Sequence, residues 1–288
     1  MRFDRAAPRH ASCGAFAADD AILTAHHVGR RRALGLQQVD DLREEGEALY
    51  GLLTALPADA WERPTPFKGR TVNWVVQHLH DADRWAVHSV TDPEGFRRWA
   101  AERARGGAAA PEPLAGKPLL DRWRSYFDDL CSALDAADPA LRAPWFGPDM
   151  GIRMMATARQ METWAHGQDI YDLLQVTRTN TDRVRNICHI GVRTMGWTFV
   201  NRKLPVPSPA PHVRLTAPSG TVWTWNDASE DHLIEGDAVE FAHVVTQGRN
   251  ITDTHLTVNG EPATEWMAIA QCFAGPPETP PEPGQRSW

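Results

Sequence analysis

The sequence predicts a helical N-terminal part followed by a small α+β domain. Six segments carry apolar residues at helical spacing before any convincing strand, and the four longer ones before Gln175 fit a four-helix bundle. After Pro205 the pattern changes to alternation with period two on either side of Pro218-Ser-Gly, which is typical of a β-hairpin. At 288 residues the chain can bury a substantial core in one large or two modest domains.

The helical segments follow one another with clear boundaries. Leu42, Leu49 and Leu53 lie on one face of the first, and Pro57 ends it. Thr71 is a suitable N-cap for the second. The expected helices cover residues 39–56, 71–90, 93–105, 119–136, 152–174 and 181–200. The last of them either packs against the bundle or leads away from it.

Strands and helices alternate in the C-terminal part. The expected strands are 212–217, 221–225, 232–235 and 254–258, and the expected helices are 238–247 and 263–273. The chain therefore divides into a flexible extension over residues 1–37, a helical bundle over 38–200, an α+β domain over 202–275 and a proline-rich tail over 276–288. We expect the tail to be disordered.

Composition excludes several classes of function. The formal net charge is −7 and the Lys and Arg residues are scattered, which argues against a nucleic-acid surface. No apolar run is long enough to span a membrane, and no secretory signal pattern precedes the first helix. The four cysteines are far apart and are expected to be reduced thiols, mostly buried: Cys13, Cys131, Cys188 and Cys272. We expect a cytoplasmic monomer or homodimer.

One polar stripe dominates the helix expected over 152–174. At about 100° per residue, Arg159, Glu162, His166 and Asp169 fall within an arc of roughly 80° on an otherwise apolar segment. Because Glu162 and His166 are one turn apart, both can reach the same divalent metal ion. Alternatively, they are an ordinary exposed i,i+4 pair, which contributes only a few tenths of a kcal/mol.

The third ligand is expected on the helix over 71–90. His78 lies within the apolar arc that contains Trp74 and Trp85 and therefore points inward, whereas His80 is turned about 200° away and is expected to be solvated. Alternatively, His78 is a core histidine hydrogen-bonded to a neighbour such as Asp81. The spacing does not separate the two interpretations.

Two segments together resemble a known family. Residues 59–79, which end in His78-Leu79, and residues 161–169, Met-Glu-Thr-Trp-Ala-His-Gly-Gln-Asp, resemble the two signatures of the mycothiol-dependent maleylpyruvate isomerase-like proteins. These proteins belong to the DinB-like superfamily of metal-binding four-helix bundles. Arg70 stands in the first signature where Trp is usual. The resemblance covers roughly residues 38–275 and is closest to the branch described only as metal-binding proteins.

The resemblance implies a ligand set and a cofactor. The carried-over protein ligands are His78, Glu162 and His166. Mycothiol would be the thiol cosubstrate, and an arginine would bind the carboxylate of a small substrate. Arg249 occupies the corresponding place in Thr246-Gln-Gly-Arg249, although the extra Gln247 departs from the family pattern. Arg159 is the competing cation, unless its charge pairs with Glu162.

Two histidines and one carboxylate leave open coordination positions, which is typical of a catalytic metal site. Zinc is the expected metal, although iron, nickel and manganese accept the same ligands. Asp81 and Asp169 each follow a ligating histidine by three residues and are candidates to orient it. Three functions remain open: a thiol-dependent isomerase or S-transferase, a metal-dependent hydrolase, and a non-catalytic small-molecule-binding protein with a structural metal.

Overall fold

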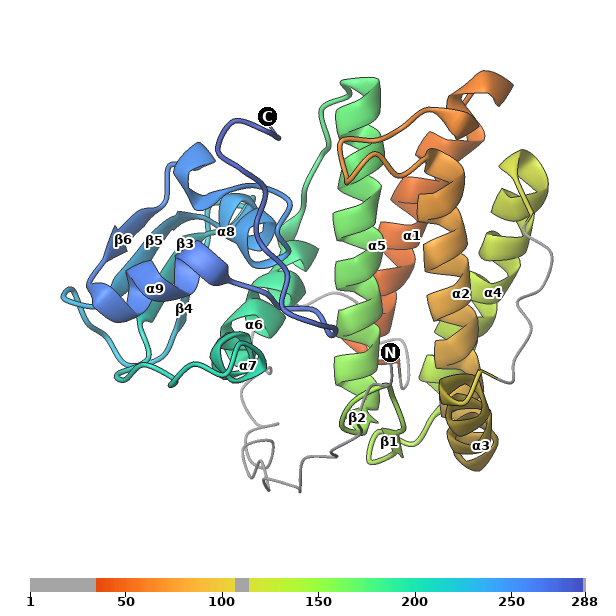
Figure 1. The fold of residues 1–288 in the computed structure, drawn as a ribbon, viewed down its shortest axis with the longest axis horizontal. Helices are drawn as coiled ribbons and strands as arrows, with labels where there is room; N and C mark the ends of the chain where they lie inside the picture. Colours follow the sequence, from red (N-terminus) through yellow and green to blue (C-terminus); the bar gives the residue numbers. More distant parts are fainter. Residues whose placement is uncertain (1–34, 107–113, 287–288) are drawn as a thin grey trace, which may run out of the picture. The chain divides into compact units, whose positions relative to one another are not determined.

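The computed structural model describes residues 35–106 and 114–286. Residues 1–34 of the expected extension, which include Cys13, lie outside the described residues. Within the described part of the chain the protein is mostly helical, with one four-stranded sheet and a short two-stranded hairpin. Figure 1 labels these elements. None of the described helices is long and apolar enough to cross a membrane.

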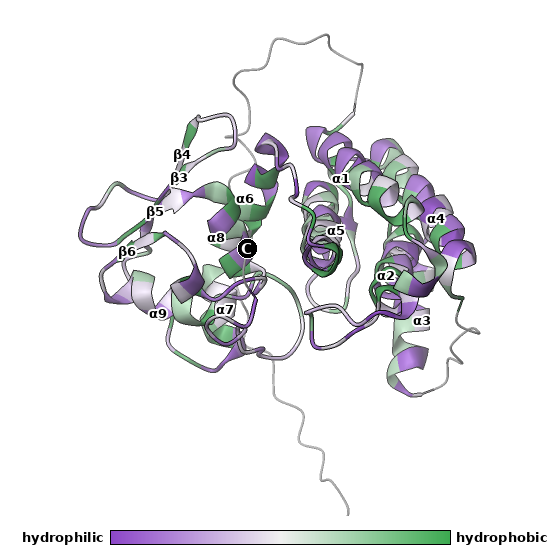
Figure 2. Cartoon of the chain, turned by 90° about the horizontal axis from the view of Figure 1, so that it is seen from above, coloured by the Kyte–Doolittle hydropathy of each residue, from purple (hydrophilic) through white to green (hydrophobic). Residues whose placement is uncertain are grey.

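Four long helices share the first core. They are α1 (Gln37–Thr54), α2 (Val72–Thr91), α4 (Gly116–Ala136) and α5 (Ile152–Leu174). α2 packs on α4 and α5, and α1 packs on the same two helices. Their apolar faces meet in one cluster, and Figure 2 shows the hydrophilic residues of α4 on its outer side. Close approach is required where α1 crosses α4, since a Cβ on Gly46 would lie 2.1 Å from Cζ of Phe127.

Short elements connect these helices. The 3₁₀ helix η1 (Ala58–Glu62) precedes α2, and α3 (Pro93–Ala104) follows it, with Asp92 as its N-cap. Strands β1 (Arg142–Ala143) and β2 (Met150–Gly151) form the antiparallel hairpin that leads into α5.

The second core contains the C-terminal elements. Its four-stranded sheet has the order β4-β3-β5-β6, in which β3 and β5 are parallel and the other neighbours are antiparallel. The strands are β3 (His212–Thr216), β4 (Val222–Trp225), β5 (Leu233–Asp237) and β6 (Thr257–Asn259). The helices are α6 (Arg185–Arg193), α7 (Met195–Asn201), α8 (Ala238–Val245) and α9 (Glu261–Ile269), with the 3₁₀ helices η2 (Asp182–Val184) and η3 (Ile251–Asp253).

The segment after α5 is divided into shorter helices than expected. The single helix expected over 181–200 is divided between η2, α6 and α7, and all three pack in the second core. Helix α6 ends at Thr194, whose hydroxyl donates to the carbonyls of Ile190 and Gly191. Such a side-chain bond to the preceding turn competes with helix continuation.

Helix α5 contributes to both cores. Met155 and Ile170 lie in the first cluster, whereas Met161 and Trp164 lie in the second. Helix α5 is therefore covered on more than one side, and its covered residues include polar side chains such as Thr157, Gln160 and Thr163.

Residues 276–286 of the expected disordered tail follow a defined path instead. Lys68 forms an ion pair with Glu278 at 2.7 Å, and Arg286, which is 6% exposed, forms ion pairs with Asp169 and Asp172 of α5. Backbone carbonyls of the segment also accept hydrogen bonds, for example from Gln247 to Glu278. Proline-rich composition predicts disorder when a segment lacks partners, and here buried charges and backbone contacts supply them.

Candidate metal centre

His78 is held on α2 by a capped and well-packed first turn. The Thr71 hydroxyl accepts a hydrogen bond from the Trp74 backbone N–H at 3.2 Å, which fixes the start of the helix. One turn later the indole of Trp74 stacks on the His78 ring, with centroids 5.4 Å apart and planes 2° apart. The His78 side chain is 34% exposed, so it lies at the edge of the core and not within it.

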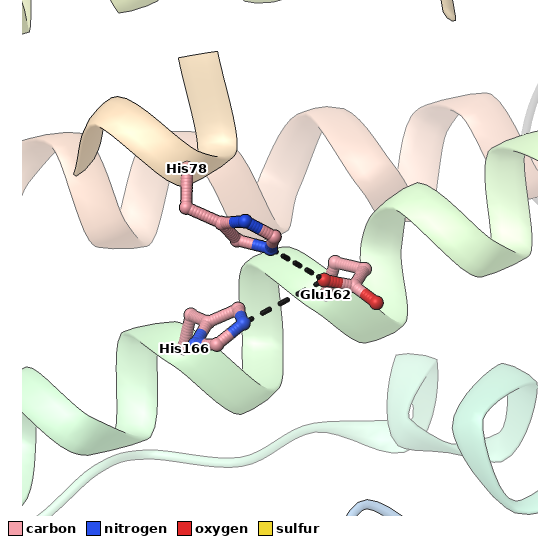
Figure 3. A group of neighbouring side chains, drawn as sticks. All are labelled: His78, Glu162 and His166. Carbon is pink, nitrogen blue, oxygen red and sulfur yellow. Dashed lines mark hydrogen bonds and ion pairs between the residues drawn. The ribbon is translucent and has the colours of Figure 1, made fainter. Parts of the chain in front are cut away.

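Glu162 and His166 face His78 from α5, as Figure 3 shows. Glu162 Oε2 is 3.1 Å from His78 Nε2 and 3.6 Å from His166 Nε2. One ligand atom from each of the three residues lies within 4.8 Å of the other two. The structure therefore brings together all three residues that were expected to be ligands.

The spacing suits one ion. Metal–ligand bonds of about 2.0–2.2 Å in a tetrahedral site place the ligand atoms roughly 3.3 Å from one another. The 3.1 and 3.6 Å separations measured from Glu162 bracket that value. Two imidazoles and a carboxylate also match the donor preference of zinc, so the residues present fit a divalent metal without rearrangement of the helices.

The charge state of Glu162 also suits a ligand. Burial raises the pKa of its carboxyl, but the hydrogen bond from His78 and the nearby charges of His166 and Arg159 outweigh burial and lower that pKa to about 2. Glu162 is therefore ionised at neutral pH, which is the form that binds a metal.

Of the two aspartates expected to orient the histidines, Asp169 lies in contact and Asp81 does not. Asp169 Oδ2 is 3.3 Å from His166 Nδ1 and the side chain is 3% exposed. Asp81 lies 3.6 Å from Arg84, and no contact joins it to His78 among the described residues. Because Asp169 contacts Nδ1, Nε2 is the ring nitrogen of His166 that faces Glu162.

Arg249 is not part of the three-residue group. Its side chain is 1% exposed and binds Asp172 through two nitrogens, at 2.8 and 2.7 Å. Arg286 lies 3.2 Å from Asp172 and also pairs with Asp169. A chain of charges thus runs from Arg249 through Asp172, Arg286 and Asp169 to His166, and Arg249 is at its far end.

The Arg159 side chain also forms an ion pair with a carboxylate. Its Nε donates to Asp83 at 2.8 Å, and Asp83 accepts a second bond from Trp123 Nε1 at 2.9 Å. The sequence left open an ion pair between Arg159 and Glu162. That expectation is wrong, because Arg159 forms its ion pair with Asp83. Its charge still contributes to the lowered pKa of Glu162.

His80 is buried, and the expectation that it is solvated is wrong. It is 6% exposed and meets the Tyr126 ring edge-on at 5.1 Å. Burial lowers its pKa. His80 does point away from His78, but α4 packs against α2 and covers that face too.

Three residues at the site were not nominated from the sequence. Phe67 meets the His166 ring edge-on at 5.1 Å, and Trp74 lies 6.1 Å from Phe67. Arg286 reaches Asp169 from the end of the chain. Trp74 was detectable, because it lies one turn before His78 on the same helix face. Phe67 and Arg286 carry no periodic signal.

The thiols of the described part of the chain are buried and protonated. Cys131, Cys188 and Cys272 are free and buried, as expected. Burial raises the pKa of the Cys131 thiol to about 12 and raises the pKa values of the other two further. None of these three is a thiolate near neutral pH.

Comparison with known proteins gives a family match and two groups of relatives. The family model described as the mycothiol maleylpyruvate isomerase N-terminal domain matches residues 42–171, which include all three residues of the site. An uncharacterized protein of Mycobacterium tuberculosis, found in two strains, is 41% identical over 246 residues. That alignment covers 83% of this chain and 96% of the relative.

Two solved structures are also similar, although distantly. They are the mycothiol-dependent maleylpyruvate isomerase and its histidine-to-alanine variant, at 14% and 13% sequence identity. The TM-scores are 0.46 and 0.45, and each likeness covers 72% of this chain and 87% of the other. Likenesses at this level carry no argument about the site.

Proposed function

This chain belongs to the mycothiol maleylpyruvate isomerase N-terminal domain family, and from that premise we propose that it is a metal-dependent enzyme that uses a low-molecular-weight thiol. The thiol is mycothiol, and the reaction is the isomerisation of a small carboxylate-bearing substrate or S-transfer to it. The observation that carries the proposal is the convergence of His78, Glu162 and His166, with ligand atoms within 4.8 Å. The four long helices are then a DinB-like bundle.

The three residues would hold one divalent ion, most simply zinc. Such an ion would supply Lewis-acid chemistry that favours the thiolate form of an incoming thiol below its free pKa of about 8.5. Glu162 stays ionised to hold the ion, and Asp169 accepts at His166 Nδ1 so that Nε2 is the ligand atom. The rings of Phe67 and Trp74 border the two histidines.

A metal-dependent hydrolase is less well supported. That reaction needs a general base beside a bound water. Near the group, Asp169 is engaged by His166 and Arg286, and Asp172 is engaged by Arg249. Glu162 is itself a proposed ligand. The described carboxylates around the site therefore already have structural partners. This favours a thiol cosubstrate over a metal-activated water as the nucleophile.

Metal content tests the ligand set. Purified protein should carry about one divalent ion per chain, as expected for a single three-ligand site. His78→Ala should lose most of the metal. His80→Ala, two residues along the same helix, should keep it, because His80 faces α4 and Tyr126. Equal metal content in the two variants, measured by elemental analysis, would overturn the assignment.

Thiol dependence separates the thiol-dependent enzyme from the other two functions. In cobalt-substituted protein, mycothiol should produce sulfur-to-metal charge-transfer absorption near neutral pH. Cys188→Ser and Cys272→Ser should leave that signal unchanged, since both thiols are buried. If neither mycothiol nor a simpler thiol changes the absorption spectrum, the result would favour the hydrolase or the binding protein with a structural metal.

A further inference from the structure

The positive side chains around the proposed metal site are almost all paired. Arg159 binds Asp83, Arg249 binds Asp172, and Arg286 binds Asp169 and Asp172. In the loop before α2, Lys68 binds Glu278 at 2.7 Å. These cations neutralise the protein's own carboxylates and are not available to a bound anion without breaking an existing pair.

Arg70 is different. It is exposed, and within residues 35–106 and 114–286 its guanidinium has neither a carboxylate within ion-pair distance nor a side-chain hydrogen bond. Its Cζ instead lies 4.6 Å from the centroid of the Trp74 ring, which is a cation–π contact. Its five N–H donors remain open to a planar anion such as a carboxylate.

The position of Arg70 is fixed by a tight turn. The Arg70 carbonyl accepts from the Thr65 backbone N–H at 2.8 Å and from its hydroxyl at 2.9 Å, and the Arg70 N–H donates to Phe67 at 2.9 Å. Lys68 and Gly69, between them, both have positive φ, at 51° and 65°. Consecutive left-handed residues are costly outside glycine, so the turn is well defined and not a loose loop.

This turn places Arg70 on the ring of Trp74, which in turn stacks on His78. Trp74 separates it from His78, and the two ring centroids are 5.4 Å apart. The guanidinium of Arg70 is therefore no farther from the His78 ring than the sum of that distance and the 4.6 Å cation–π separation. A thiol with a chain of several carbons, such as mercaptohexanoate, is long enough to span this interval.

We infer that Arg70 is the anion-binding residue of this site and holds the carboxylate of a molecule bound at the metal. The inference rests on the proposed function, because it needs a ligand at the metal. It replaces Arg249 in that role. The charges agree with it: a divalent ion with Glu162 and one thiolate is neutral, so a substrate carboxylate needs one further cation, and Arg70 is unpaired within the described chain.

Two thiols of equal length provide the test. Mercaptohexanoate and mercaptohexanol differ only in their far end, and the chain is long enough to disfavour chelation of the metal by the carboxylate. Their dissociation constants are measured from the charge-transfer absorption of cobalt-substituted protein at low salt, where surface charge is least screened. Each is compared between the wild type, Arg70→Gln, Arg70→Lys and Lys68→Gln.

Arg70→Gln should weaken mercaptohexanoate binding by about fivefold, as expected for an exposed charge pair of about 1 kcal/mol, and should leave mercaptohexanol unchanged. Arg70→Lys should recover part of the loss. Lys68→Gln, two residues away, should leave the ratio of the two constants unchanged, because Lys68 already pairs with Glu278.

Each other result overturns a specific claim. Equal weakening of both thiols in Arg70→Gln would mean that Arg70 acts only by packing on Trp74, and the inference would be wrong while the metal–thiol function stands. An unchanged ratio would also reject it. Absence of absorption with either thiol in the wild type would reject the proposed function, and the role of Arg70 with it.

Discussion

Asp169→Asn is expected to weaken metal binding while leaving all three ligands in place. The Asp169 carboxylate accepts from His166 Nδ1 and so fixes both the tautomer and the direction of the ring. Asparagine has the same shape but lacks the charge, and its amide can present a donor to Nδ1 where an acceptor is needed. His166 then loses part of the orientation that points Nε2 at the metal.

The geometry sets the magnitude. Loss of a ligand-orienting partner costs about 10- to 100-fold in metal affinity. The 3.3 Å separation between His166 Nδ1 and Asp169 Oδ2 is longer than the roughly 2.7–2.9 Å of a strong charge-assisted bond. We therefore expect the lower end, about tenfold, which corresponds to about 1.4 kcal/mol. The apo protein should also be less stable, because Arg286 loses one of its two carboxylate partners.

Asp81→Asn is the matched control. Asp81 also follows a proposed ligand by three residues, but its partner is Arg84 at 3.6 Å and both side chains are partly exposed. The affinity for metal, measured by competition with a chromophoric chelator, should be unchanged. A wild-type metal affinity in both variants would show that the Asp169 contact does not orient His166. Equal losses would indicate a general effect of negative charge.

Three further outcomes follow from the buried charges. Arg249→Gln should destabilise the protein by about 1.5–3 kcal/mol in urea unfolding, because Asp172 loses its bidentate partner but keeps Arg286 at 3.2 Å; an unchanged unfolding midpoint would contradict this. The apo protein should lose stability as pH falls below about 6.5, because burial and nearby arginines lower the pKa of His243 in the folded state. The unfolded chain then takes up a proton that the folded chain does not. His243→Gln should reduce this pH dependence of the unfolding free energy, measured by urea titration at pH 7.5 and 5.5. Deletion of residues 276–288 should remove Glu278 and Arg286, lower the melting temperature and weaken metal binding, and retention of both properties would show that the segment is dispensable.

Elements with a strong local signal were predictable from the sequence. The segment 152–174 was expected as a helix with the bounds that α5 has, because its apolar residues and the polar stripe share one period. The inward faces of two helices made the convergence of His78 with Glu162 and His166 one of two open interpretations, and the family resemblance favoured it. Both conclusions depend on which way a side chain points from its own helix.

Features that depend on a distant partner were not predictable. His80 was expected in solvent because it lies opposite His78, but nothing in α2 reveals that α4 covers that face. Asp81 and Asp169 have the same spacing from a histidine and yet differ in their contacts, since rotamer and neighbours decide the partner. Arg249 was chosen by resemblance, and its bidentate pair with Asp172 required the structure.

The C-terminal part of the chain supplies no ligand, yet it is joined to the metal site at three places. Helix α5 carries Glu162 and His166 and, in the same turns, inserts Met161 and Trp164 into the second core. Residues 276–286 add two charged contacts, from Glu278 to Lys68 in the loop before α2 and from Arg286 to Asp169 beneath His166. A shift of the second core would therefore move two of the three proposed ligands relative to His78. The geometry of the site thus depends on packing across the whole described chain, and grafting the three ligands onto a bundle alone would not reproduce it.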